Sequence, residues 1–350
     1  MNALGNRIVK LIETQGPLSV AQFMTIALLD PEAGYYATRD PFGARGDFVT
    51  APEVSQMFGE LVGLWCVQAW LDQEKPKGAQ LVELGPGRGT LMADALRAAK
   101  LARDFVKNVD VVLVEASATL RGLQRERLKD FTVIWKDRFE ADERPTFLIA
   151  NEFFDALPIR QFVHTERGWC ERMIVVDNGK LAFALSPVPS NVVIEGDAPY
   201  GGVYETSPAS LALAEDIGRT IARRSGAALI IDYGYERPGF GETLQAVGRH
   251  QFKDLLEKPG AVDLSAHVDF TALAAAARAG GAQTYGPVGQ GRFLEALGIR
   301  ARAEKLARAN RREVSAITAA VDRLVGREQM GTLFKALAIM PPNAPPPPGF

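Results

Sequence analysis

Residues 151–158, NEFFDALP, place an amide and two carboxylates close together, directly after an apolar run that ends at Ala150. Two such carboxylates can accept hydrogen bonds from the N–H groups of a guanidinium bidentately and keep its positive charge away from one nitrogen. If that nitrogen attacks an electrophile, a carboxylate can also take up the proton that the nitrogen releases. Glu152 and Asp155 are therefore the candidate catalytic residues. The alternative is a turn with an N-cap carboxylate, which explains Asp155 more readily than Glu152.

A second segment that could serve a chemical function is residues 81–91, LVELGPGRGTL, where an apolar run leads into Gly85, Gly87 and Gly89. Glycines let a ligand approach the backbone, and the helix that follows offers unpaired N–H groups, so an adenosine-like ligand is expected. The dinucleotide pattern G-x-G-x-x-G fails at Thr90. The pattern E-x-G-x-G-x-G, beginning at Glu83, is the form found in class I S-adenosylmethionine-dependent methyltransferases. A tight strand-to-helix turn without a ligand is the alternative.

Short apolar segments alternate with helical patterns along the chain, which predicts a parallel sheet wound with helices. The expected strands are residues 81–84, 109–114, 132–135, 147–150, 227–231 and 331–340. Ligands bind at the carboxyl ends of such strands, and the polar residues at these ends are Glu115, Asp137 and Asn151. We expect Glu115 to accept both ribose hydroxyls, unless it caps the next helix, and Asp137 to meet the adenine amino group.

The candidate site for S-adenosylmethionine therefore consists of glycines and strand-end side chains, namely Gly85, Gly87, Gly89, Glu115, Asp137 and Asn151. Other residues are expected to border it. Asp232 follows a strand as a plausible lip residue, and the loop after it carries His250, Asp263, His267 and Asp269 near the acceptor pocket; Asp269 equally suits a helix N-cap. Residues 50–53 match a capping box between Thr50 and Glu53, and the preceding loop, 40–50, either covers the cofactor or is purely structural.

Composition narrows the function classes. The chain has 350 residues, with 40 basic and 42 acidic residues and a net charge of −2, so no broad attraction to nucleic acid or anionic membrane is expected. Cys66, Cys170 and three histidines form no disulfide framework or metal-spaced cluster. The chain has neither an apolar signal core at its start nor an apolar run of ~20 residues, which predicts a cytoplasmic protein without membrane insertion.

The sequence also resembles the MidA-like methyltransferases, a family that includes a mitochondrial assembly factor of respiratory complex I. The shared motifs are Gly34-Tyr35-Tyr36, Gly46-Asp47-Phe48 through Phe58-Gly59-Glu60, the glycine motif, residues 151–158 with Gln161-Phe162, residues 231–234, residues 259–260 and 263–270, and residues 290–299. The resemblance implies an α/β class I methyltransferase (Rossmann-like) fold, with a mostly parallel seven-stranded sheet, a helical N-terminal region, and β and helical insertions. It also implies methylation of a protein arginine, with a complex I subunit as the acceptor.

The expected organisation is an N-terminal helical and loop cover over residues 1–75 and a methyltransferase domain over residues 76–340. Insertions are expected at about 159–225, beginning with a β hairpin at Asn178-Gly179, and at 289–330. The second insertion is helical and basic, and its charge indicates a solvated face or, alternatively, docking of an acidic partner. Residues 341–350 form a proline-rich tail.

Two other functions remain open at this stage. An assembly chaperone would keep the fold and bind a respiratory subunit without chemistry. A methyltransferase for a small molecule or RNA would keep the cofactor and change the acceptor. The oligomeric state is undetermined by the sequence.

Overall fold

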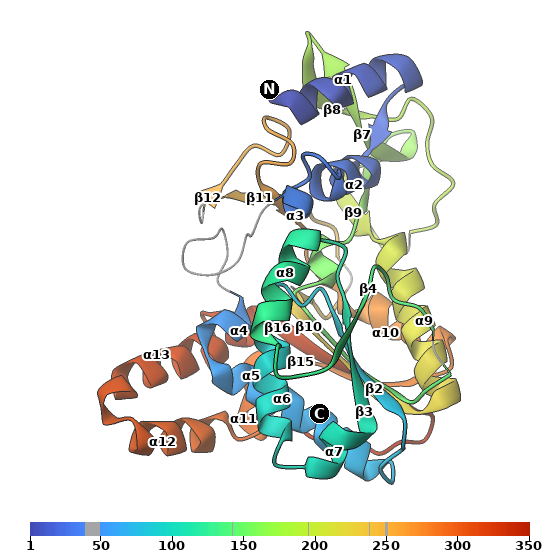
Figure 1. Ribbon diagram of the computed structural model, residues 1–350. Helices are drawn as coiled ribbons and strands as arrows, with labels where there is room; N and C mark the ends of the chain where they lie inside the picture. The colour runs from blue at the N-terminus through green and yellow to red at the C-terminus, as the bar shows by residue number, and fades with distance from the viewer. Residues whose placement is uncertain (39–49, 142, 195, 238, 249–250) are drawn as a thin grey trace.

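The computed structural model describes residues 1–38, 50–141, 143–194, 196–237, 239–248 and 251–350. The chain forms a lobe built on a large central sheet and a second lobe above it (Figure 1). Among the described residues, no helix has the length and apolar character that crossing a bilayer requires.

The central sheet confirms the predicted α/β class. Its strand order is β15-β16-β10-β5-β2-β3-β4, and the short strand β14 pairs in parallel with the end of β10. The strands are β2 (Ala79–Leu84), β3 (Val109–Val114), β4 (Val133–Lys136), β5 (Thr146–Asn151), β10 (Gly226–Tyr235), β14 (Val268–Asp269), β15 (Gln283–Gly289) and β16 (Phe334–Met340). The pairs among β4, β3, β2, β5 and β10 are parallel, whereas β16 runs antiparallel to both neighbours.

Helices cover both faces of this sheet, which explains why β2 and β5 are buried along their whole length. One face packs against α5 (Gln56–Asp72), α6 (Thr90–Ala99) and α7 (Arg103–Asn108). The other packs against α9 (Pro208–Arg224) and α10 (Phe270–Ala279). Helix α8 (Ala118–Arg127) follows β3. The helix expected to start at Thr50 is divided into α4 (Ala51–Val54) and α5, with Ser55 as the N-cap of α5.

The second lobe combines distant parts of the chain around one core. Its N-terminal part is α1 (Ala3–Gln15), β1 (Leu18–Ser19), α2 (Val20–Leu29) and α3 (Tyr35–Thr38). These pack with a sheet of β1, β6 (Arg160–Thr165), β7 (Gly168–Asp177), β8 (Lys180–Leu185) and β9 (Val203–Thr206), and with β11 (Gln245–Gly248), β12 (Gln251–Phe252) and β13 (Asp263–Ser265). The predicted hairpin is confirmed, since Asp177 pairs with Lys180 across Asn178-Gly179. Residues 1–75 thus divide between two cores, because α4 and α5 belong to the sheet lobe.

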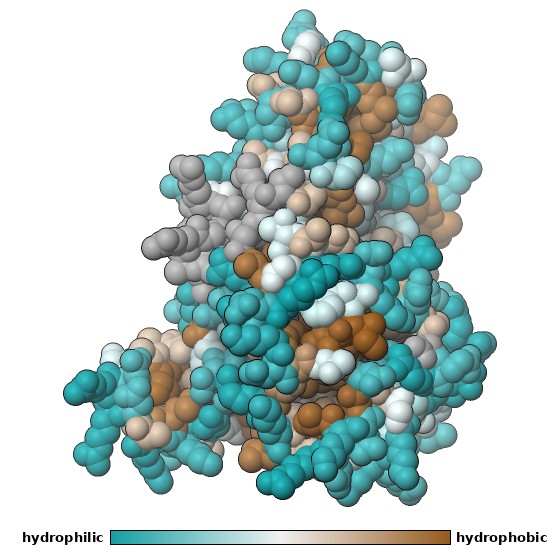
Figure 2. Space-filling view, viewed as in Figure 1, coloured by the Kyte–Doolittle hydropathy of each residue, from teal (hydrophilic) through white to brown (hydrophobic). Residues whose placement is uncertain are grey.

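The helical insertion comprises α11 (Gln290–Ala296), α12 (Ile299–Ala309), η2 (Arg311–Glu313), α13 (Val314–Val325) and α14 (Met330–Leu333), and α12 and α13 project from the sheet lobe (Figure 1). In α13, Val321 and Leu324 are buried, but Val314 is 43% exposed, so the apolar side chains of this helix are covered only towards its end. The space-filling view shows apolar and charged residues side by side on this projection (Figure 2). The predicted strand at 331–340 starts at Phe334, because residues 330–333 are helical.

We predict opposite effects for two helical glycine-to-alanine changes. A Cβ on Gly218 would lie 2.2 Å from the carbonyl oxygen of Ala277 where α9 crosses α10, so Gly218→Ala should destabilise the protein by about 1–3 kcal/mol. Gly122 in α8 has open space around it, and Gly122→Ala should stabilise by about 0.5–1 kcal/mol through helix propensity. Urea unfolding measures both, and equal changes in the two variants would contradict the packing account.

Candidate active site

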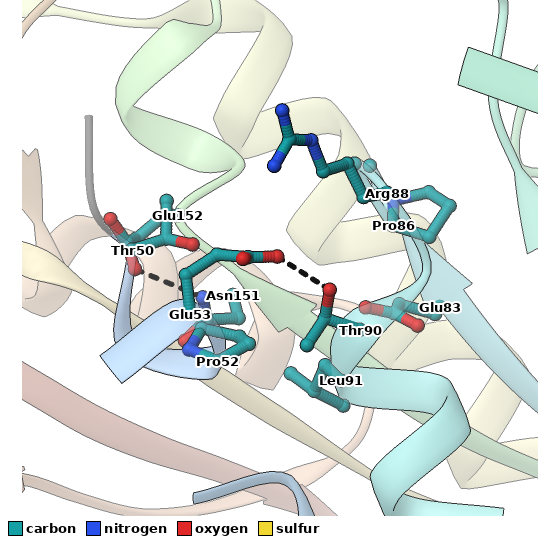
Figure 3. A pocket seen from close by; sticks show the side chains of 12 residues that line it. Thr50, Pro52, Glu53, Glu83, Pro86, Arg88, Thr90, Leu91, Asn151 and Glu152 are labelled. Atoms are coloured by element: carbon teal, nitrogen blue, oxygen red, sulfur yellow. Dashed lines mark hydrogen bonds between the residues drawn. The ribbon is translucent and has the colours of Figure 1, made fainter. Parts of the chain in front are cut away.

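An open cleft lies at the carboxyl ends of β2 and β5, with about 370 Å³ of empty space that includes its open mouth. Figure 3 shows its walls. One wall is the glycine turn and the start of α6, another is α4, and the strand-end residues Asn151 and Glu152 face them. The lining residues are Thr50, Pro52, Glu53, Glu83, Gly85, Pro86, Gly87, Arg88, Thr90, Leu91, Asn151 and Glu152.

The glycine turn requires glycine for its own geometry. Gly85, Gly87 and Gly89 have φ angles of +59°, +52° and +76°, which side chains of L residues rarely adopt. At Gly85, a Cβ would also lie 2.7 Å from a ring carbon of Phe153. Gly85 and Gly87 line the cleft, whereas Gly89 is the N-cap of α6. The turn therefore exposes its backbone to the cleft as the sequence predicts.

Three buried acceptor oxygens near this cleft have no hydrogen-bond donor within the described part of the chain. They are Glu83 Oε2, Asn151 Oδ1 and Asp155 Oδ1. Leaving a buried acceptor unpaired costs about 1–3 kcal/mol, so these atoms suit a ligand that brings N–H groups. S-adenosylmethionine carries an ammonium group and fits Glu83 and Asn151, which line the cleft. Glu83 was not among the residues predicted for the site; a carboxylate inside an otherwise buried strand was the available signal.

Burial makes the carboxylates of this region weaker acids than usual. Desolvation raises the pKa of Glu83 to about 8, that of Glu152 to about 7 and that of Asp155 to about 6. The backbone N–H of Ala51 donates to Glu152 Oε1 at 3.0 Å and opposes its shift. The Tyr233 hydroxyl does the same for Asp155 at 2.6 Å. Glu152 also has a φ of +49°, a strained conformation that often occurs at functional sites.

Asp232 holds the acidic segment in place. Its Oδ2 accepts the backbone N–H groups of Phe153, Phe154 and Asp155 at 3.1, 3.0 and 3.2 Å. The side chain lies beneath the segment with no solvent exposure, so the expectation of a lip residue is wrong. Burial, and then the charges of Asp155 and Glu152, raise the pKa of Asp232 well above its usual value. Asp232 is a support for the site.

Helix α4 is joined to the glycine turn by side chains. The predicted capping box does not form, because the Thr50 side chain makes no cap bond. Glu53 instead accepts a hydrogen bond from the Thr90 hydroxyl at the start of α6, and Arg127 of α8 donates to the same hydroxyl. Figure 3 shows Glu53 and Thr90 meeting across the cleft. The sequence analysis missed this link, since residues 53 and 90 carry no local pattern that joins them.

Comparison with known proteins identifies this architecture. Residues 61–288 match the family described as "Putative S-adenosyl-L-methionine-dependent methyltransferase". The chain belongs to this family. Over its full length it is 36% identical to "Protein arginine methyltransferase NDUFAF7, mitochondrial" of Xenopus tropicalis, covering 89% of that protein. Its identity to the Homo sapiens protein of the same name is 35%, over 94% of this chain and 81% of that protein.

A solved structure agrees with this assignment. A COG1565 superfamily member and likely methyl transferase from Burkholderia thailandensis, bound to S-adenosyl-homocysteine, superposes with a TM-score of 0.85. The two chains are 31% identical, over 97% of this chain and 92% of that one. The class I methyltransferase fold and the cofactor S-adenosylmethionine, both predicted from the sequence, are confirmed. The curated relatives are named as mitochondrial proteins, and this finding contradicts the predicted cytoplasmic location.

Besides Gly89, two residues predicted to bind the cofactor, Glu115 and Asp137, lie outside the lining of this methyltransferase's cleft. Glu115 is buried and accepts hydrogen bonds from Ser117 N–H at 2.8 Å and Gln124 Nε2 at 3.2 Å. Gln124 Nε2 also donates to the carbonyl oxygen of Gly87 at 2.7 Å, which links Glu115 to the glycine turn. Asp137 is exposed and pairs with Arg121. Their contacts to ribose and adenine stay predictions.

The residues expected around the acceptor pocket of the methyltransferase divide into three groups. Asp263 accepts a hydrogen bond from the Tyr36 hydroxyl at 2.8 Å. His267 and Asp269 line a second cavity, and Asp269 is confirmed as the N-cap of α10 because it accepts from Ala272 N–H. His250 and the loop before Thr50 lie outside the described residues. Among the described residues, no cluster of metal-ligating side chains occurs.

We predict that the stability of the methyltransferase falls as pH rises between about 5 and 8, because the folded state then holds protons that the unfolded carboxylates have lost. Glu152→Gln removes one such group. At about pH 8 this variant should be more stable than the wild type by about 1–3 kcal/mol, and the gain should shrink towards pH 5. Urea unfolding at both pH values measures it. Glu166→Gln, at an exposed site, is the control and should show no such gain; a pH-independent effect of Glu152→Gln would contradict the account.

Proposed function

We propose that this protein is an S-adenosylmethionine-dependent protein arginine N-methyltransferase. The observation that carries the proposal is the position of Glu152, a half-buried carboxylate that lines the cofactor cleft, with the buried Asp155 near enough for its charge to raise the pKa of Glu152. The names of the curated relatives support an arginine acceptor. We also propose a respiratory complex I subunit as the acceptor protein, on the basis of the MidA-like resemblance.

Glu152 and Asp155 have complementary tasks in this proposal. The cofactor, when bound, supplies an electrophilic methyl group. Glu152 accepts N–H groups of the guanidinium at the cleft and orients one nitrogen towards that methyl group. Methylation of a guanidinium nitrogen releases one proton, and a carboxylate whose pKa is about 7 suits its uptake near neutral pH. Asp155, held by Tyr233, adds negative charge behind Glu152.

The cofactor contacts belong to the same proposal. Gly85 and Gly87 would let the main chain approach the methionine part, with Gly89 starting α6 beside it. Glu83 Oε2 and Asn151 Oδ1, which have no donor among the described residues, would accept hydrogen bonds from the ammonium group. Glu115 would accept hydrogen bonds from the ribose hydroxyls once its hydrogen bond with Gln124 is broken. Asp137 would contact the adenine amino group once its ion pair with Arg121 is broken.

Glu152→Gln should lower methyl transfer by at least about 100-fold, because the amide neither takes up a proton nor balances the guanidinium charge. Binding of S-adenosylhomocysteine should stay within about tenfold of the wild type, since the shape is kept. Mass spectrometry of cell extract incubated with isotope-labelled cofactor measures transfer and identifies the labelled residue, and isothermal titration measures binding. Undiminished transfer to arginine would show that the acceptor nitrogen is activated elsewhere. Label on RNA or a small molecule would replace the proposed acceptor.

Gly87→Val tests whether the glycine turn holds the cofactor. A β-branched side chain at φ +52° strains the turn and faces the cleft, so binding of S-adenosylhomocysteine should weaken by about 100-fold or more. Gly201→Val is the matched control, because Gly201 has a φ of +77° with open space around it, in the other lobe. Equal binding by both variants would contradict the assignment. Support of respiratory-chain assembly by a Gly87→Val protein that binds no cofactor would favour the chaperone alternative.

A further inference from the structure

A second open cavity, of about 510 Å³, lies where α9 and α10 begin. Phe154 lines it, two residues along the chain from Glu152, which lines the cofactor cleft. The other walls come from β9, the end of β10 and the segment before α10. The two cavities therefore border the same short acidic segment.

The charges in this second cavity are negative. Glu205 and Asp269 line it, and no lysine or arginine does among the described residues. Burial lowers the pKa of His267, so its ring is neutral near pH 7. The starts of α9 and α10 contribute about half a positive charge each, but Ser207 and Asp269 already cap them. Glu205 is buried and already accepts hydrogen bonds from Gln161, Thr243 and Leu244, so it contributes negative charge to the cavity but no free acceptor.

Aromatic rings accompany the carboxylates. Tyr204 and Tyr235 also line the cavity. Burial raises the pKa of Tyr235, and the charges of Asp269 and Glu205 raise it further, which shows that their field reaches this hydroxyl. Carboxylates beside aromatic faces are the combination that recognises an organic cation.

The cavity is also connected to the acidic segment. The His267 ring packs edge-on against the Tyr233 ring, with centroids 5.5 Å apart, and the Tyr233 hydroxyl donates to Asp155 at 2.6 Å. One side chain, Tyr233, thus separates a wall of the cavity from the second catalytic candidate. The Cα atoms of Glu152 and Phe154 are at most about 7 Å apart along the chain, which is within the reach of adjacent side chains of one bound peptide.

We propose that the second cavity is a subsite for a lysine or arginine side chain that neighbours the methylated arginine in the acceptor protein. This inference rests on the proposed arginine methyltransferase function and deepens it. The subsite selects acceptors with basic residues around the methylated one.

Binding of two fluorescein-labelled peptides tests the subsite, Gly-Lys-Gly-Arg-Gly-Lys-Gly and its counterpart with glutamate in place of lysine. By fluorescence anisotropy with S-adenosylhomocysteine present, the wild type should bind the lysine peptide about tenfold more tightly. Asp269→Asn removes the charge and keeps an N-cap acceptor, and Ala272→Leu fills the cavity without changing charge. Each should reduce the preference to about twofold. Asp130→Asn, at an exposed site in the turn after α8 and outside the lining of the cavity, is the charge-matched control and should keep it.

A preference that survives in Asp269→Asn or Ala272→Leu, or that is lost equally in Asp130→Asn, would overturn the subsite. Transfer of labelled methyl groups to the lysine peptide is measured in parallel. Peptide preference without any transfer to arginine would count against the proposed function and leave the cation subsite standing. Transfer to both peptides at equal kcat/KM, without a binding preference, would overturn the subsite alone.

Discussion

The site depends on one buried carboxylate that accepts hydrogen bonds from three consecutive backbone N–H groups. Asp232 lies in β10 just past the part that pairs with β5, and it fixes residues 153–155, which follow β5. Because β5 and β10 are adjacent parallel strands, this carboxylate ties two strand ends together at the point where the sheet opens to the ligand. The positions of Glu152 and Asp155 are therefore fixed by the sheet.

The same contacts concentrate negative charge in a dry region. Burial is the main cause that raises the pKa values of Glu152, Asp155 and Asp232. The charge of Asp155 raises the pKa of Glu152 further, and both carboxylates raise that of Asp232. Such a cluster destabilises the folded protein when its members ionise. A cationic ligand relieves that cost, so the structure is arranged to be more stable when occupied. Within the described part of the chain, one buried side-chain oxygen of each of Glu83, Asn151 and Asp155 likewise lacks a hydrogen-bond donor, which a ligand would bring.

Local patterns explain which parts of this arrangement the sequence predicts. The glycine turn, the parallel strands and the Asn178-Gly179 hairpin each follow from residues that are neighbours in the chain, and the structure has all three. The link from Glu53 to Thr90 and the support from Asp232 join residues 37 and about 80 positions apart, which no periodicity encodes. Glu115 shows a third case: the strand end was found, but Ser117 and Gln124 satisfy the carboxylate in ways that spacing alone does not predict.

The lobe above the sheet has a consequence for how the chain acquires its structure. Its core joins residues near the N-terminus to strands around residues 160–185 and to the segment around residues 244–266. During synthesis the first helices leave the ribosome well before these partners exist, and their apolar faces stay uncovered in that interval. Ordering of this lobe is a late, non-local event that closes long loops. A nascent chain therefore carries the apolar faces of α1 and α2 uncovered until translation has passed the segment that ends near residue 266.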